Sequence, residues 1–186
     1  MSAASAHFDF SQQRVLITGG TSGIGEACAT AFVEAGARGV ISGRNHDRAA
    51  AIIKRCQGAA GSIAFVAGDI SKRKGCKLIV TEAVGIHGGL DVVVNSAGVI
   101  YHATAEETTD EQWQQTMKVN VNGVFYICRA AIPHLRPGKG TIINIASDAA
   151  LSGSQHLTAY CASKGAVLQM TRAMALDYAQ EGIRIV

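Results

Sequence analysis

The sequence predicts a doubly wound α/β fold, in which a parallel sheet carries helices on both faces. Short apolar runs rich in Val and Ile alternate along the chain with longer stretches of helical spacing. Such runs are typical of strands buried on both faces, and parallel strands need crossover helices because tight hairpins cannot join them. A glycine-rich turn directly after the first run also suits this fold. Strands are expected at residues 14–18, 39–42, 62–66, 90–95 and 140–146, with a sixth at 183–186.

The composition indicates one folded domain over residues 1–186. Hydrophobic residues make up 48% and charged residues 17% of the chain, and the 21 Gly against 2 Pro suit regular elements joined by tight turns. No apolar run approaches the roughly 18 residues that a membrane span requires, and residues 1–13 carry no export leader. A cytoplasmic protein without a membrane partner is therefore expected.

Charge and cysteine content argue against a nucleic-acid-binding protein, a disulfide-bonded protein and a metal-binding protein. The net charge is only +3, and the densest basic run, residues 72–74, has no interleaved aromatic side chains. It is interpreted as a solvated helix start, so no nucleic-acid partner is expected. The five Cys form no C-x-x-C pair, which favours reduced thiols over disulfides and predicts no metal site.

Helical stripes and caps fill the segments between the strands. Apolar stripes are expected at Ala27, Ala31 and Val33 after the first strand, and at Trp113, Met117, Val121 and Val124 after the fourth. Thr109 or Asp110 could cap the helix that contains Trp113, and Thr158 the helix that contains Tyr160.

The turn after the first strand is a candidate phosphate-binding loop. Gly19 would permit the tight turn, Gly23 would let the backbone approach a pyrophosphate, and Gly25 would let the helix pack closely. The following helix would offer its free N–H groups to the anion. A purely structural turn is the alternative. The candidate residues are Thr18, Gly19, Thr21, Ser22, Gly23, Ile24 and Gly25.

The end of the second strand bears on the choice of cofactor. An acid there would accept a hydrogen bond from the ribose 2′-hydroxyl of NAD, but this chain has Gly43 followed by Arg44 and Asn45. An Arg pairs well with a 2′-phosphate, which favours NADP(H) over NAD(H). An ordinary exposed Arg would leave NAD(H) possible.

Two further strand ends would lie at the same edge of the sheet. Asn95, Ala97 and Gly98 follow the fourth strand, where small residues leave the backbone open to a ligand. Asp69, followed by Ile70, ends the third strand and could hydrogen-bond an adenine. Capping the next helix is the alternative for Asp69.

Ser147, Tyr160 and Lys164 form a candidate proton-transfer site. Tyr160 and Lys164 are four positions apart in one predicted helix, so they share a face. A phenol has a pKa of about 10 and exchanges protons poorly at neutral pH until a nearby cation stabilises the phenolate. Tyr160 could then act as general acid or base on a substrate oxygen that Ser147 holds.

Together these motifs resemble the short-chain dehydrogenase/reductase family, with T-G-x-x-x-G-x-G at residues 18–25, N-x-A-G at 95–98 and Y-x-x-x-K at 160–164. The resemblance implies a single Rossmann-type domain and a catalytic tetrad of Asn120, Ser147, Tyr160 and Lys164, in which Asn120 holds a water in a relay with Lys164. It also implies that Tyr160 and Lys164 contact the cofactor, Lys164 at the nicotinamide ribose, and that Thr18, Asp69, Ile70 and Asn95 line the cofactor.

The resemblance also implies homodimers or homotetramers that pack through the helices containing Trp113 and Tyr160. Val167, Met170 and Met174 would suit such an interface or, equally, the core. The sequence stops at residues 183–186, within the expected sixth strand, where the family continues with a Pro-Gly turn, a substrate loop and a seventh strand. A C-terminally shortened member with an open nicotinamide end is therefore expected.

The leading functional hypothesis is an NADP(H)-dependent oxidoreductase that interconverts a small-molecule carbonyl and a secondary alcohol. It would resemble the 3-oxoacyl-carrier-protein reductase and the sugar or polyol dehydrogenase branches. An NAD-dependent dehydrogenase of the same family and a truncated, non-catalytic dinucleotide-binding module are the alternatives.

Overall fold

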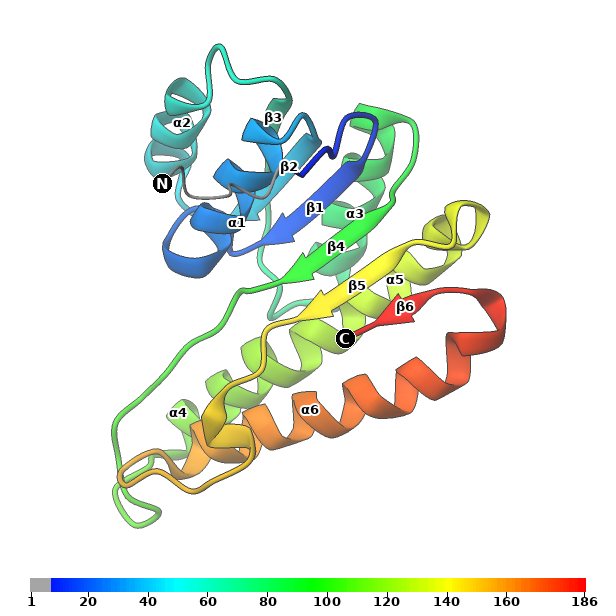
Figure 1. The fold of residues 1–186 in the computed structure, drawn as a ribbon. Coiled ribbons are helices and arrows are strands. Elements are labelled where there is room, and N and C mark those ends of the chain that lie inside the picture. Colours follow the sequence, from blue (N-terminus) through cyan, green and yellow to red (C-terminus); the bar gives the residue numbers. More distant parts are fainter. Residues whose placement is uncertain (1–7) are drawn as a thin grey trace, which may run out of the picture.

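A parallel sheet of six strands forms the centre of the computed structural model, which describes residues 8–186 (Figure 1). The strands are β1 (Arg14–Thr18), β2 (Arg38–Gly43), β3 (Ser62–Ala67), β4 (Val92–Asn95), β5 (Thr141–Asn144) and β6 (Arg184–Ile185). Their order is β3-β2-β1-β4-β5-β6, with every neighbouring pair parallel. The predicted α/β fold is confirmed; the first seven residues of the predicted domain lie outside the described residues.

Helices cover both faces of the sheet (Figure 1). They are α1 (Gly23–Glu34), α2 (His46–Arg55), α3 (Arg73–His87), α4 (Asp110–Thr116), α5 (Val124–Leu135) and α6 (Thr158–Tyr178), with a π-helical segment η1 (Met117–Gly123) joining α4 to α5. One apolar cluster joins α1 and α2 to the sheet through Val33, Ile41 and Ile52. The other joins α3 and α5 to the opposite face around Ile79 and Ile127. The fold is thus doubly wound.

The strand order reverses between β1 and β4, which places a crevice at their carboxyl ends. The chain first moves outward from β1 to β3, then returns to the other side of β1 and continues to β6. Thr18 is in register with Ser42 on one side and with Asn95 on the other. The glycine loop and the ends of β2 and β4 therefore meet at one level, where open α/β sheets bind ligands.

Two of the predicted helical stripes are wrong in detail. In α1 the buried stripe is Gly25, Ala29 and Val33, whereas Ala27 and Ala31 are exposed. After β4, Trp113 is 42% exposed and Met117 and Val121 are half-buried, so Val124 alone of the predicted stripe is buried. Met117 and Val121 lie in η1, where π-helical turns hold an extra residue and rotate the side chains away from the spacing of an α-helix.

The helix caps give one confirmed prediction and one correction. Thr109 caps α4 in a reciprocal capping box with Gln112. Thr158 is the first residue of α6 and not its cap; Leu157 holds that position and no side chain caps the helix. The basic residues 72–74 are exposed at the start of α3, as predicted.

Val167 and Met174 on α6 are buried in the core, while Met170 packs partly buried against it. The interface interpretation is therefore wrong for Val167 and Met174, and the core interpretation holds. Both lie on the face of α6 that turns toward the sheet, which also carries Lys164.

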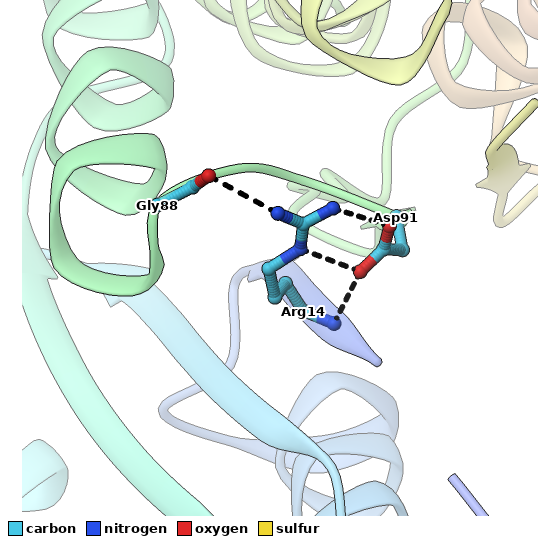
Figure 2. A network of polar contacts seen from close by, with 3 residues as sticks. All are labelled: Arg14, Gly88 and Asp91. Carbon is cyan, nitrogen blue, oxygen red and sulfur yellow. Dashed lines mark hydrogen bonds and ion pairs between the residues drawn. The ribbon is translucent and has the colours of Figure 1, made fainter. Parts of the chain in front are cut away.

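An ion pair between Arg14 and Asp91 lies at the amino ends of β1 and β4, where β4 begins at Val92 rather than at the predicted Leu90. Figure 2 shows Arg14 donating from Nε and Nη2 to both carboxylate oxygens of Asp91, each at 2.7 Å. The Arg14 backbone N–H also donates to Asp91 at 2.9 Å, and Nη1 donates to the carbonyl of Gly88 at 3.1 Å. Asp91 therefore ties the start of β1 to the turn that follows α3.

We expect Asp91→Asn to lower the free energy of unfolding at pH 7 by about 2 kcal/mol, because it leaves a half-buried Arg14 without its carboxylate. Hydrogen bonds from Arg14, and its charge, hold the pKa of Asp91 below its ordinary value. This stabilisation is therefore complete above the ordinary carboxyl pKa of about 3.9 and is lost as the pH falls through the lower folded value.

Urea unfolding at pH 7 and pH 3 measures this effect, and the difference between parent and variant should shrink at pH 3. Glu181→Gln, which removes the partner of Arg136 in an exposed ion pair, is the control and should cost much less. Equal losses for the two variants at pH 7 would contradict the structural role of Asp91.

Candidate active site

The glycine loop between β1 and α1 is built by close contacts at two of its glycines. Gly19 has φ +66°, and a Cβ there would lie 2.7 Å from Cα of Ala97. At Gly25 a Cβ would lie 2.5 Å from the carbonyl oxygen of Gly19 and from Oγ of Ser96. These contacts hold the loop against the end of β4. Gly23, with φ +55°, has no atom within 4 Å of its Cβ position, so its backbone is open to a ligand.

A cavity of about 340 Å³ lies in front of this loop, at the carboxyl ends of β1 to β4. The structure brings ten of the predicted cofactor residues to its wall: Gly19, Thr21, Ser22, Gly23, Ile24, Arg44, Asp69, Ile70, Ala97 and Gly98. These residues come from the ends of β1 to β4, whereas Asn120, Ser147, Tyr160 and Lys164, which were predicted from the sequence to surround the same crevice, do not line this cavity. The volume is in the range of small-molecule sites.

The other predicted cofactor residues do not line the cavity: Thr18, Gly25, Asn45, Asn95, Tyr160 and Lys164. Oγ1 of Thr18 lies 3.5 Å from both the carbonyl of Val94 and the amide of Ala97, between β1 and β4. Asn45 caps α2 by accepting from the amide of Arg48 at 2.9 Å. Asn95 is buried between β4 and β5. These residues shape the site from outside the cavity.

Six lining residues were not predicted: Ser42, Gly43, Gly68, Ser96, Val99 and Val119. Five of them lie within two positions of a predicted residue at a strand end, and the strand-end rule could have included them. Val119 is the exception, because tertiary contacts bring η1 beside the loop after β4.

The side chain of Thr21 crowds the end of β2. A Cβ at Gly43 would lie 2.9 Å from Oγ1 of Thr21, so any larger side chain at position 43 would have to displace the Thr21 side chain. Arg44 is exposed on the cavity wall. The cavity wall therefore carries a cation directly after the position at which an NAD site would have an acid.

Asp69 faces the same cavity as a carboxylate. Burial acts to raise its pKa, but hydrogen bonds from Ser71 and the charges of Lys72 and Arg44 outweigh burial and leave the pKa below its ordinary value. Oδ1 accepts from the amide of Ser71 at 3.0 Å, whereas Lys72 is the N-cap of α3. Asp69 thus does not cap α3, and its second oxygen lies 3.8 Å from Nζ of Lys72.

Tyr160 and Lys164 lie one turn apart on α6, as the spacing predicts. Lys164 is only 7% exposed, and its Nζ donates to the carbonyl of Ile145 at 2.6 Å. The same nitrogen lies 5.7 Å from the centre of the Tyr160 ring. Burial lowers the pKa of Lys164. The structure thus places a poorly hydrated ammonium beside the ring of the half-buried Tyr160.

Ser147 is held by its own turn. Its hydroxyl donates to Oδ1 of Asp148 at 2.9 Å and accepts from the amide of Ala149 at 3.2 Å. The hydrogen bonds from Ser147 and Ala149 keep the pKa of Asp148 below its ordinary value. Before it can donate to a substrate oxygen, the Ser147 hydroxyl must leave the Asp148 carboxylate.

Asn120 lies in η1 and fastens the loop after β4. Its Oδ1 accepts from the amide of Val99 at 2.8 Å, and its Nδ2 donates to the carbonyl of Val99 at 2.9 Å and to Oγ of Ser163 at 3.0 Å. Both amide protons are therefore used. No hydrogen bond joins Asn120 to Lys164 among the described residues, and the side chain could offer a water only the second lone pair of Oδ1.

The doubly wound sheet, its reversal of strand order beside β1 and its open glycine loop define a fold of the dinucleotide-binding class. The sequence profile of the family described as short chain dehydrogenase matches residues 13–186. The chain belongs to the short-chain dehydrogenase/reductase family.

Known relatives agree with this assignment. The chain is 39% identical over 175 residues to a 3beta-hydroxysteroid dehydrogenase of Mediterraneibacter gnavus, covering 94% of this chain and 63% of that protein. It is 40% identical over 179 residues to a glucose 1-dehydrogenase of Gluconobacter oxydans, covering 95% and 67%. A short-chain type dehydrogenase/reductase from Mycobacterium marinum superposes with a TM-score of 0.90 at 32% identity, covering 96% and 74%. The chain thus spans less than two thirds of the first of these relatives.

Proposed function

We propose that the protein is an NADP(H)-dependent oxidoreductase that interconverts a small-molecule carbonyl and a secondary alcohol, with Tyr160 as general acid and base. The observation that carries the proposal is the buried ammonium of Lys164 beside the ring of Tyr160, on the helix that follows β5. In this family setting a phenol with a fixed cation serves proton transfer.

The cavity residues fit the cofactor. The open position at Gly23 and the free N–H groups at the start of α1 suit a pyrophosphate, because anions bind well at helix N-termini. Arg44 would pair with the 2′-phosphate, and Asp69 would hydrogen-bond the adenine. When bound, the cofactor supplies or accepts the hydride. The residues of the chain then have to move one proton at the substrate oxygen.

Tyr160 would donate that proton to a carbonyl oxygen or take it from an alcohol. Lys164 would stabilise the phenolate that results and hold the nicotinamide ribose. Ser147 would hold the substrate oxygen, and Asn120 would hold the loop after β4 and contribute to a water relay.

Arg44→Ala tests the cofactor preference. We expect NADPH affinity to fall about tenfold while NADH affinity stays near that of the parent, because only NADPH carries the phosphate that Arg44 would pair with. Titration calorimetry with both cofactors measures this difference. Arg48→Ala, an exposed Arg on α2 outside the cavity, is the matched control. Equal NADPH binding by parent and Arg44→Ala would favour NAD(H) instead.

The substrate class within this chemistry is a secondary alcohol of the sugar, polyol or steroid kind, or a 3-oxoacyl thioester. The relatives named for a steroid and for glucose support the first group. A non-catalytic dinucleotide-binding module is the competing function. It predicts cofactor binding without turnover in this chain and in any longer form.

Assembly and location complete the proposal. Homodimers or homotetramers would form through α4, α5 and α6, and the exposed Trp113 and Phe125 on α4 and α5 support this.

All five Cys are free thiols, and burial raises the pKa of Cys76 to about 11 and that of Cys128 to about 12. Free thiols suit a reducing compartment such as the cytoplasm. None of the described helices is long and apolar enough to cross a membrane.

A further inference from the structure

A chain of buried hydrogen bonds connects the end of β4, through β5, to the helix that carries Tyr160 and Lys164. Nδ2 of Asn95 donates to Oδ1 of Asn144 at 2.9 Å, and Nδ2 of Asn144 donates to Oγ1 of Thr171 at 2.9 Å. The Thr171 hydroxyl donates onward to the carbonyl of Val167 at 2.7 Å. All three polar side chains are buried. The chain therefore joins the cavity edge of the sheet to the interior face of α6.

A second connection runs beside it through the backbone. The amide of Ile145 donates to the carbonyl of Asn95 at 3.0 Å, and the carbonyl of Ile145 accepts from Nζ of Lys164 at 2.6 Å. Asn144 is the last residue of β5 and Ile145 follows it, so two adjacent residues bind α6, one at Thr171 and the other at Lys164. The two points, Lys164 and Thr171, are two turns apart on one face of the helix.

The side-chain connection has few substitutes. Oδ1 of Asn95 is buried and has no hydrogen-bond partner among the described residues. The amide group of Asn95 is therefore oriented through its Nδ2, and Oδ1 of Asn144 is the strong acceptor for that nitrogen. Sγ of Cys128 also lies 3.4 Å from Nδ2 of Asn95, but sulfur is a weak acceptor. Removal of the Asn144 side chain would leave Nδ2 of Asn95 without its strong acceptor and would break the hydrogen bond between Thr171 and β5. Buried polar groups without partners lower the stability of the fold.

We propose that Asn144 is a positioning residue: through Thr171 it sets how deeply α6 sits against β5, and so keeps the Lys164 ammonium on the Ile145 carbonyl and beside Tyr160. This inference rests on the proposed oxidoreductase function. Tyr160 is the titratable side chain that the described structure places against the ammonium. A small shift of α6 away from β5 would separate Nζ of Lys164 from the Ile145 carbonyl. The freed ammonium would then gain water and lose its fixed position beside the Tyr160 ring.

The test compares Asn144→Leu and Thr171→Val with Thr171→Ser, which restores the hydroxyl. Thr30→Val is the matched control, because Thr30 makes the same bond to a carbonyl four residues back, 3.0 Å to Glu26, without a partner from the sheet. The measurements are the pKa of Lys164 by NMR of labelled lysine, assigned with Lys164→Arg, and the kcat and KM of carbonyl reduction.

We expect Asn144→Leu and Thr171→Val to raise the pKa of Lys164 toward its ordinary value, because the ammonium gains water. They should lower kcat about tenfold with KM little changed, since the reacting groups are misplaced. Thr171→Ser and Thr30→Val should behave like the parent in both measurements.

The proposal would be overturned if Asn144→Leu and Thr171→Val lost thermal stability while the Lys164 pKa and the kcat stayed at the values of the parent. The network would then have a purely structural role. If the parent shows no turnover with any carbonyl substrate while the Lys164 pKa responds as expected, the oxidoreductase function fails and the positioning of Lys164 by Asn144 stands.

Discussion

Tyr160→Phe should lower kcat/KM for carbonyl reduction by about 10² to 10⁴, the range over which a positioned acid contributes to proton transfer. The change removes only the phenol oxygen and keeps the ring that lies against Lys164. NADPH affinity should therefore change little. The loss should appear mainly in kcat, because the proton is needed in the transition state and not in the ground state.

Tyr178→Phe is the control for this variant, since Tyr178 is a half-buried tyrosine at the far end of the same helix. It should retain the activity of the parent. Steady-state kinetics with NADPH and a panel of carbonyl substrates measures both variants. Activity of Tyr160→Phe close to that of the parent across substrates would remove Tyr160 from the role of general acid.

The fold could be predicted from the sequence because its signals are local. Strands buried on both faces are continuous apolar runs, and their alternation with helical segments allows few topologies. The errors arise where tertiary contact decides. The buried stripe of α1 begins at Gly25 because that glycine contacts Gly19 and Ser96. The spacing of Ala27 and Ala31 does not indicate this contact.

The candidate site could be predicted to a similar extent. Residues at strand ends were found because the carboxyl edge of a parallel sheet gathers them. The position of Val119 depends on η1, whose extra residue per turn leaves no trace in the spacing. The contact between Thr21 and Gly43 likewise joins two loops, and the glycine at 43 indicates a missing acid without showing what fills its place.

Gly23→Ala should lower NADPH affinity about a hundredfold while the protein remains folded. The position has φ +55° and nothing within 4 Å of an added Cβ, so the fold meets no clash. The methyl group would instead project into the cavity, where the pyrophosphate should approach the backbone. Calorimetric titration with NADPH measures the affinity, and urea unfolding measures the stability.

Gly58→Ala separates the two effects of the substitution. Gly58 also has positive φ, +85°, and open space around its Cβ position, but it lies in the loop after α2, outside the cavity wall. Both variants should lose about 1 kcal/mol of stability, because a left-handed backbone disfavours any Cβ. Only Gly23→Ala should lose NADPH affinity. Equal affinity in the two variants would mean that the cofactor does not approach the backbone at Gly23, and the phosphate site would have to lie elsewhere along the crevice.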